Sequence, residues 1–173
     1  MKAIYKAIAA KLFADFNDNS LQGGHLGKPK LSVDLWNRQT ERQQEQHPLF
    51  LPAVFVEFST ANYKRNSSGV QNGTQEIVIR VVQETYSDTF EGSGTQEKAL
   101  EVLDLLEAVY VSLQDLSGEQ FSKLERKTQS YDNNYNNIIV FEMVFMTSFV
   151  DDTKLSATEY IGITPDLMPE REM

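Results

Sequence analysis

The sequence predicts an α+β fold in which a four-stranded, mainly antiparallel sheet carries two helices on one face, in the order α-β-β-α-β-β. Three observations predict it. Residues 138–149 (IIVFEMVFMTSF) carry one charge, at Glu142, and are typical of a long strand. Two segments repeat apolar residues at helical spacing. The predicted strands are linked by short or looping returns, which favours antiparallel pairing. Because both helices are amphipathic, they cover only one face of the sheet.

Composition limits the possible organisation and partners. The chain has 173 residues, which suits a single domain with a sizeable core, and we place this domain at 1–150. A net charge of −9 argues against a sequence-independent grip on nucleic acid and against an anionic membrane surface. Cysteine is absent, which excludes disulfides, thiolate metal sites and a cysteine nucleophile. We expect no signal peptide and no membrane-spanning segment.

The first third of the chain is predicted to hold one helix and one long insertion. Residues 2–16 place apolar side chains at helical spacing, and the polar run NDNS ends the helix. We expect residues 17–47 to be an irregular surface insertion, rich in turn-forming residues and pinned at Trp36.

The next part of the chain predicts a hairpin. Residues 52–59 (PAVFVEFS) and 74–86 (TQEIVIRVVQETY) alternate side chains between two faces, as strands do. The polar residues between them, 60–73, are expected to form a protruding loop. Asn72-Gly73 fits that loop because both residues tolerate a positive φ.

The second half of the chain begins with the clearest helical pattern, within SDTFEGSGTQEKALEVLDLLEAVYVSL at 87–113, where Ser93 or Thr95 can cap the helix. We expect Ser117-Gly118 to end this helix. Its apolar stripe is expected to contain Ala99, Val102, Leu103, Leu106, Val109, Tyr110 and Leu113. A polar strand at 121–130, a turn at 131–137 (YDNNYNN), the strand at 138–149 and an extended arm at 151–173 follow.

The sheet is predicted to have more apolar surface than two helices can cover. Phe55, Val78, Val82 and one face of 138–149 are left over, and a large exposed apolar patch usually marks an interface. We therefore expect neighbouring copies or partner proteins to cover it. The predicted contact residues are Phe55, Tyr63, Lys64, Arg65, Val78, Val82, Tyr131, Asp132, Tyr135, Phe141, Phe145 and Tyr160.

No catalytic, cofactor or metal motif stands out in the sequence. His25 and His47 lie in the polar insertion without ligand spacing, and GGHLGK is not a phosphate loop because Lys28 precedes Pro29. Acidic pairs near 88–92 and 151–152 are typical of solvated loops. A short basic run, Lys123, Arg126 and Lys127, lacks the interleaved aromatic residues of a nucleic-acid platform.

An enzymatic alternative stays open at this point. Glu57 and Glu142 each interrupt an apolar strand, and a carboxyl group buried there has a raised pKa suited to proton transfer. Glu84 and Asp88 would be the other acidic members of such a site, for a small enzyme or a ligand-binding domain.

The order of elements resembles that of the phage tail terminator, or tail-completion, proteins of the virion neck. The resemblance lies in PAVFVEFS, QEIVIRVVQETYSD, QEKALEVLDLLEAVYVSLQDL and FSKLERKTQSYDNNYNNIIVFEMVFMTSF, and it covers residues 2–16 and 52–150. It rests on order and pattern, without an invariant motif.

That resemblance implies a ring, commonly sixfold, which caps the tail tube or joins the tail to the head connector. It implies no catalysis, cofactor or membrane contact, and DNA only as cargo that passes through a channel. The location implied is the virion neck or tail, after assembly in the host bacterial cytoplasm. Another virion neck, tube or secretion-system adaptor subunit of the same fold is the alternative within this class.

Overall fold

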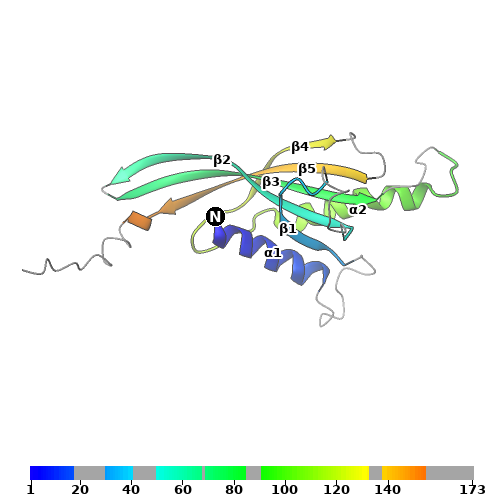
Figure 1. Cartoon of the computed structure of the whole chain (residues 1–173), viewed down its shortest axis with the longest axis horizontal. Coiled ribbons are helices and arrows are strands. Elements are labelled where there is room, and N and C mark those ends of the chain that lie inside the picture. The colour runs from blue at the N-terminus through cyan, green and yellow to red at the C-terminus, as the bar shows by residue number, and fades with distance from the viewer. Residues whose placement is uncertain (18–29, 41–49, 68, 85–90, 133–137, 155–173) are drawn as a thin grey trace, which may run out of the picture.

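The computed structural model describes residues 1–17, 30–40, 50–67, 69–84, 91–132 and 138–154, and these form an α+β fold with two helices and one open sheet. Both helices pack on the same face of the sheet, as the sequence predicts (Figure 1). The elements are α1 (Lys2–Phe16), β1 (Ser32–Leu35), β2 (Ala53–Ser67), β3 (Val70–Glu84), α2 (Gln96–Leu113), β4 (Glu125–Asp132) and β5 (Ile138–Asp151).

The sheet has five strands in the order β1-β2-β3-β5-β4, so the predicted four-stranded sheet is wrong in strand number. The extra strand, β1, pairs in parallel with Ala53–Val56 of β2, while the other pairs are antiparallel. β1 is not evident in the sequence because it lies inside the predicted irregular insertion and its four residues are too few to show alternation.

The predicted loop at 60–73 is also wrong, because these residues extend the hairpin. β2 continues to Ser67 and β3 begins at Val70, with Gly69 in the connection at a φ of 86°. The polar residues hold strand conformation because β3 pairs on both sides, with β2 and with the last third of β5. At a rise of about 3.4 Å per residue, each hairpin strand is roughly 50 Å long.

The junction between α1 and β1 is fixed by a reciprocal pair of hydrogen bonds. The Asn17 side-chain amide donates to the Leu31 carbonyl over 2.8 Å, and the Leu31 amide donates to Asn17 Oδ1 over 2.8 Å. Asn17 thus ends the helix and aligns the start of β1 beside β2.

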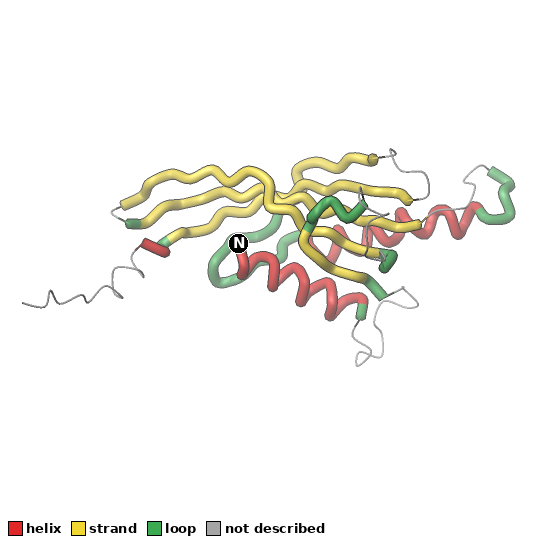
Figure 2. Tube along the Cα trace, viewed as in Figure 1, coloured by secondary structure: helices red, strands yellow, loops and turns green. Residues whose placement is uncertain are grey.

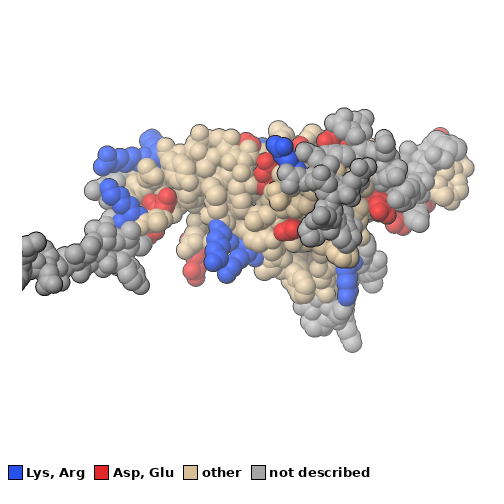
Figure 3. All heavy atoms as spheres, in the orientation of Figure 1, with Lys and Arg blue, Asp and Glu red and all other residues tan. Residues whose placement is uncertain are grey.

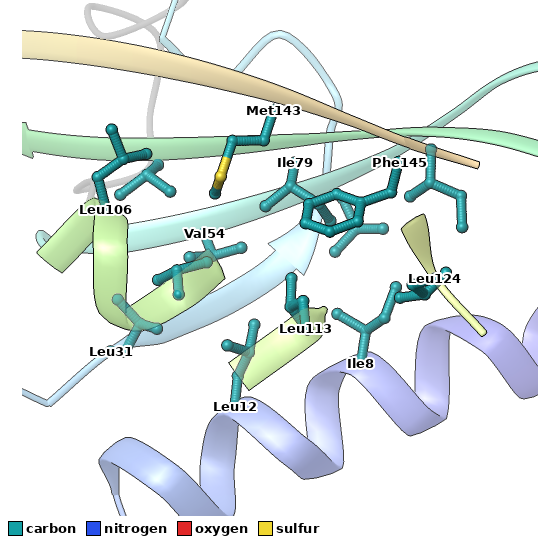
Figure 4. Close-up of a cluster of buried hydrophobic side chains, with 14 of the residues drawn as sticks. Ile8, Leu12, Leu31, Val54, Ile79, Leu106, Leu113, Leu124, Met143 and Phe145 are labelled. Atoms are coloured by element: carbon teal, nitrogen blue, oxygen red, sulfur yellow. The ribbon is translucent and has the colours of Figure 1, made fainter. Parts of the chain in front are cut away.

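The main core lies between the helices and the sheet. Ile8 and Leu12 of α1 and Leu113 of α2 point toward Ile79, Met143 and Phe145 of the sheet (Figure 4). The labelled side chains are almost fully buried. Each buried side chain of this size contributes about 1.5–3 kcal/mol, so the layer is the main source of stability.

A second apolar cluster lies on the opposite face of the sheet. Ala53, Phe55, Val82, Ile138 and Val140 are buried there, and partly buried Trp36 and Leu51 pack against them. Over this half of the sheet, the chain's own β1–β2 connection contributes to covering the surplus apolar face. The expectation that neighbouring copies or partner proteins cover Phe55 and Val82 is therefore wrong.

The other half of the sheet projects beyond the helices. Figures 1 and 2 show β2, β3 and the end of β5 extending past the N-terminus of α1 as a narrow ribbon. β1 pairs only with the first residues of β2, and β4 pairs with Val140–Met146 of β5. We call this part the projecting ribbon: residues 60–73 with 147–151.

Candidate functional site

Three strands meet at a charged cluster on the sheet face opposite the helices. Arg80 of β3 donates from Nε to Glu142 Oε1 of β5 over 2.7 Å, and its Nη1 pairs with Glu57 Oε2 of β2. The register places Arg80 directly beside Glu142. On its other side Arg80 pairs with Phe55, two residues before Glu57 on β2. The guanidinium carbon lies 4.4 Å from the Trp36 ring centroid, a cation–π contact.

This cluster gives the two candidate carboxylates a structural role. The sequence singled out Glu57 and Glu142 because each interrupts an apolar strand, and the structure brings them together around one guanidinium. Trp36 in turn contacts Phe55 edge-on, with ring centroids 5.7 Å apart. Trp36 therefore connects the charged cluster, through Arg80, to the second apolar cluster, through Phe55. It does not resemble a proton-transfer site, since each carboxylate is committed to an ion pair.

The remaining acidic candidates do not join this cluster. Glu84 is exposed at the end of β3, and Asp88 lies outside the described residues. Hydrogen bonding from the Thr153 side chain lowers the pKa of Asp151, and the Thr153 amide, which donates to Asp151 Oδ1 over 3.1 Å, lowers it further. Among the residues that the structure describes, no group of three or more acidic or histidine side chains is placed to hold a metal ion. His25 and His47 lie outside those residues.

Four of the predicted contact residues are buried by the chain itself. Phe55, Val78 and Val82 belong to the second face, and Phe145 belongs to the main core, where it is fully buried. Phe55 was predicted at the surface because the sequence does not show that Trp36 packs against it. Phe145 was predicted there because the sequence does not show which face of 138–149 the helices cover. As they stand, these side chains do not offer a surface to a partner.

The exposed predicted contacts lie at two places. Tyr63, Lys64 and Arg65 are exposed on the projecting ribbon. Tyr131 is exposed on β4 and stacks on half-buried Phe141, with ring centroids 5.1 Å apart. Asp132, at the end of β4, is half-buried, and Tyr135 and Tyr160 lie outside the described residues.

The projecting ribbon is held by an aromatic contact over a glycine. Gly73 of β3 pairs with Tyr63 of β2 and Phe149 of β5, and the two rings meet edge-on at 5.6 Å. A Cβ on Gly73 would lie 2.3 Å from the Phe149 ring. Beside this contact are two open hollows of about 400 and 380 Å³, which share Glu119, Gln120, Phe149 and Val150 in their linings.

The short basic run, Lys123 before β4 and Arg126 and Lys127 on it, makes contacts within the chain. Lys123 contacts Asp115 at 3.4 Å, and Lys127 pairs with Glu125. The Arg126 guanidinium carbon lies 3.6 Å from the Tyr110 ring centroid of α2. These contacts fix β4 and the connection after α2, which accounts for the run without a nucleic-acid ligand.

The outer face of α2 is the surface that the sequence analysis missed. Leu103 was placed in the buried stripe, yet it is 48% exposed, and Val111 is 63% exposed. Glu107 lies between them at helical spacing and is exposed. The spacing of 103, 107 and 111 is the signal that would have shown this face, because the three residues are one turn apart.

The resemblance to tail terminator proteins stays a prediction, because comparisons with known proteins do not test it. Comparison with protein-family models finds no match, and comparison with curated proteins finds none either. Within the described residues, neither helix is long and apolar enough to cross a membrane.

Proposed function

We propose that this chain is a structural virion protein of the tail-terminator type. In this proposal it forms a ring, sixfold by resemblance, that caps the tail tube or joins the tail to the head connector. It assembles in the host bacterial cytoplasm and ends in the virion neck or tail. DNA passes through as cargo, and neither a cofactor nor a membrane takes part.

The observation that supports this proposal is the projecting ribbon. The outer end of the ribbon extends past the N-terminus of α1 (Figure 2), while Tyr63 and Phe149 at its base border a hollow that Ile4 of α1 also lines. An isolated ribbon of this kind adds little to the core. Exposed Tyr63 and Val150 on the ribbon are suited to contact with another protein. A ring requires each subunit to present two different surfaces, and a projecting element at one end is one of them.

The enzymatic alternative has less support. Its two central carboxylates, Glu57 and Glu142, are both paired with Arg80. The hollows beside the ribbon contain Glu119, Asp151 and Asp152, but no histidine or cysteine lines them within the described residues. A neck or secretion-system adaptor of the same fold would have the same ribbon. The identity of the protein that it binds is what distinguishes such an adaptor from a terminator.

Electron microscopy of the purified chain, alone and mixed with candidate tube, portal and connector proteins, tests the proposal. We expect rings alone or on the end of tail tubes. A matched control replaces Lys64–Asn72 by a two-residue Asn-Gly turn, which shortens the hairpin between Tyr63 and Gly73 and leaves the helix-covered half intact. This control is expected to fold and to form no ring. Single, unassociated copies of the wild-type chain in every mixture would contradict the proposal.

A further inference from the structure

The end of the hairpin is basic although the chain is acidic. Lys64 and Arg65 are exposed, and from Ser59 to Gln75 the sequence contains no acidic residue. Basic side chains gather at the left end of the molecule, over the β2–β3 hairpin (Figure 3). Neither Lys64 nor Arg65 has an ion-pair partner among the residues that the structure describes.

The outer face of α2 is acidic with apolar residues interleaved. Its exposed residues are Glu97, Glu101, Leu103, Asp104, Glu107 and Val111. We call these six residues the α2 outer face. None of its four carboxylates has an ion-pair partner in the described ranges. A helix face with exposed leucine and valine beside free carboxylates is complementary to long basic side chains, whose stems are apolar and whose heads are charged.

These two surfaces lie at opposite ends of the molecule. The hairpin ends on one side, and α2 begins near the other (Figures 1 and 2). The hairpin strands themselves are roughly 50 Å long at about 3.4 Å per residue, so the hairpin end does not reach α2 of its own chain. Two different complementary surfaces on one chain produce a head-to-tail contact, which repeats into a closed ring or a filament.

We propose that the hairpin end of one copy docks on the α2 outer face of the next copy. Arg65 pairs with Asp104 and Glu107, and its apolar stem covers Leu103. Lys64 lies on the opposite face of β2 and adds positive charge at the same end of the hairpin. This contact deepens the proposed ring function and rests on it. The occupant is a second copy because the complementary charge and the exposed apolar residues are both present in this chain.

Other occupants fit the surfaces less well. Strand addition to the free edge of β2 is disfavoured because Lys and Arg on an edge strand oppose backbone pairing with another chain. Nucleic acid fits poorly because two basic residues displace few counterions and the chain as a whole carries a net charge of −9.

Charge reversal on each surface tests the contact. The hairpin variant Lys64→Glu/Arg65→Glu and the helix variant Asp104→Lys/Glu107→Lys alter exposed side chains, so both are expected to fold with unchanged circular dichroism. By light scattering across a concentration series, each alone is expected to need at least about tenfold more protein than wild type for half assembly. An equimolar mixture of the two is expected to assemble, because both contacts in an alternating ring are again between opposite charges.

A matched control reverses two exposed lysines on α1, Lys2→Glu/Lys6→Glu, which changes the net charge as the hairpin variant does. This control is expected to assemble like wild type. If wild type assembles and the hairpin variant assembles equally well, or if the mixture fails to recover, the docking contact is overturned while the ring proposal stands. A wild type that stays a single chain alone and with its tube proteins overturns both.

Discussion

Arg80 and Glu142 face each other across β3 and β5, with Arg80 Nε 2.7 Å from Glu142 Oε1. The same guanidinium pairs with Glu57 on β2, so one cation links three adjacent strands. The Arg80 side chain is 15% exposed and those of Glu142 and Glu57 are 29% and 36% exposed. The cluster therefore joins the three central strands of the sheet through two partly buried ion pairs.

Replacing Arg80 by leucine is expected to lower the free energy of unfolding by about 2 kcal/mol. The change leaves two partly buried carboxylates beside each other, and their partial exposure keeps the cost below that of a fully buried pair. Urea denaturation measures it. Arg80→Leu combined with Glu57→Gln and Glu142→Gln is expected to recover part of the loss. A change under about 0.5 kcal/mol for Arg80→Leu would show that the cluster adds nothing to stability.

Gly73→Ala is expected to destabilise the chain by about 1–3 kcal/mol, because the new Cβ would lie 2.3 Å from the Phe149 ring and the ring must move. Gly94→Ala is the matched control, since nothing lies within 4 Å of a Cβ there. Thermal unfolding of both variants checks the prediction. Adding Phe149→Leu to Gly73→Ala should relieve the clash. Equal melting temperatures for the two alanine variants would contradict the aromatic contact.

Phe145 was predicted as a contact residue, yet it lies in the core, and its substitution can be compared with one at an exposed ribbon residue. Because Phe145 is fully buried by its own chain, Phe145→Ala is expected to cost about 3–5 kcal/mol of unfolding free energy. Val150→Ala, at a side chain that is 60% exposed on the ribbon, is expected to change it by less than about 0.5 kcal/mol. Denaturant titration compares them. If the Phe145→Ala chain kept its stability but no longer assembled, Phe145 would be an interface residue and not a core residue.

Tyr5 is expected to make stability fall at alkaline pH. Burial raises the pKa of Tyr5, and the negative charge of Asp34 raises it further. The fold thus favours the neutral phenol, and this contribution is present below the unfolded pKa of about 10 and is lost as pH rises through the folded pKa. Tyr5→Phe should therefore lose less stability than wild type above about pH 10.

Denaturant midpoints at several alkaline pH values measure this difference, and Asp34→Asn serves as the matched variant. Asp34→Asn removes the negative charge that acts on Tyr5, so it is expected to lower the pKa of Tyr5 in an absorbance titration of the tyrosines. Identical alkaline slopes for wild type and Tyr5→Phe would contradict the assignment.

The parts of the fold that depend on local periodicity could be predicted from the sequence. The bounds of α1 agree with the predicted 2–16, and residues 138–149 lie within β5. Ile8 and Leu12 repeat at helical spacing, and Met143 and Phe145 alternate with the opposite face, so burial follows directly from the pattern.

The parts that depend on contacts between distant segments could not be predicted. Residues 60–67 and 70–73 are mostly polar, yet they hold strand conformation because β3 pairs with β2 on one side and with β5, far along the chain, on the other. Gly73 leaves room there for the Phe149 ring. Phe55 was expected at the surface, yet Trp36 packs beside it from the connection after β1. The charged cluster could not be predicted either, because only the register between the strands shows that Glu57 and Glu142 meet at one arginine.

Native mass spectrometry of the full chain over a range of concentrations tests whether these subunits form a closed ring. A ring built from head-to-tail contacts predicts one dominant species, at a single integral multiple of the chain mass, that does not grow further as concentration rises. A single chain at every concentration, with or without tail tube protein, would contradict this account.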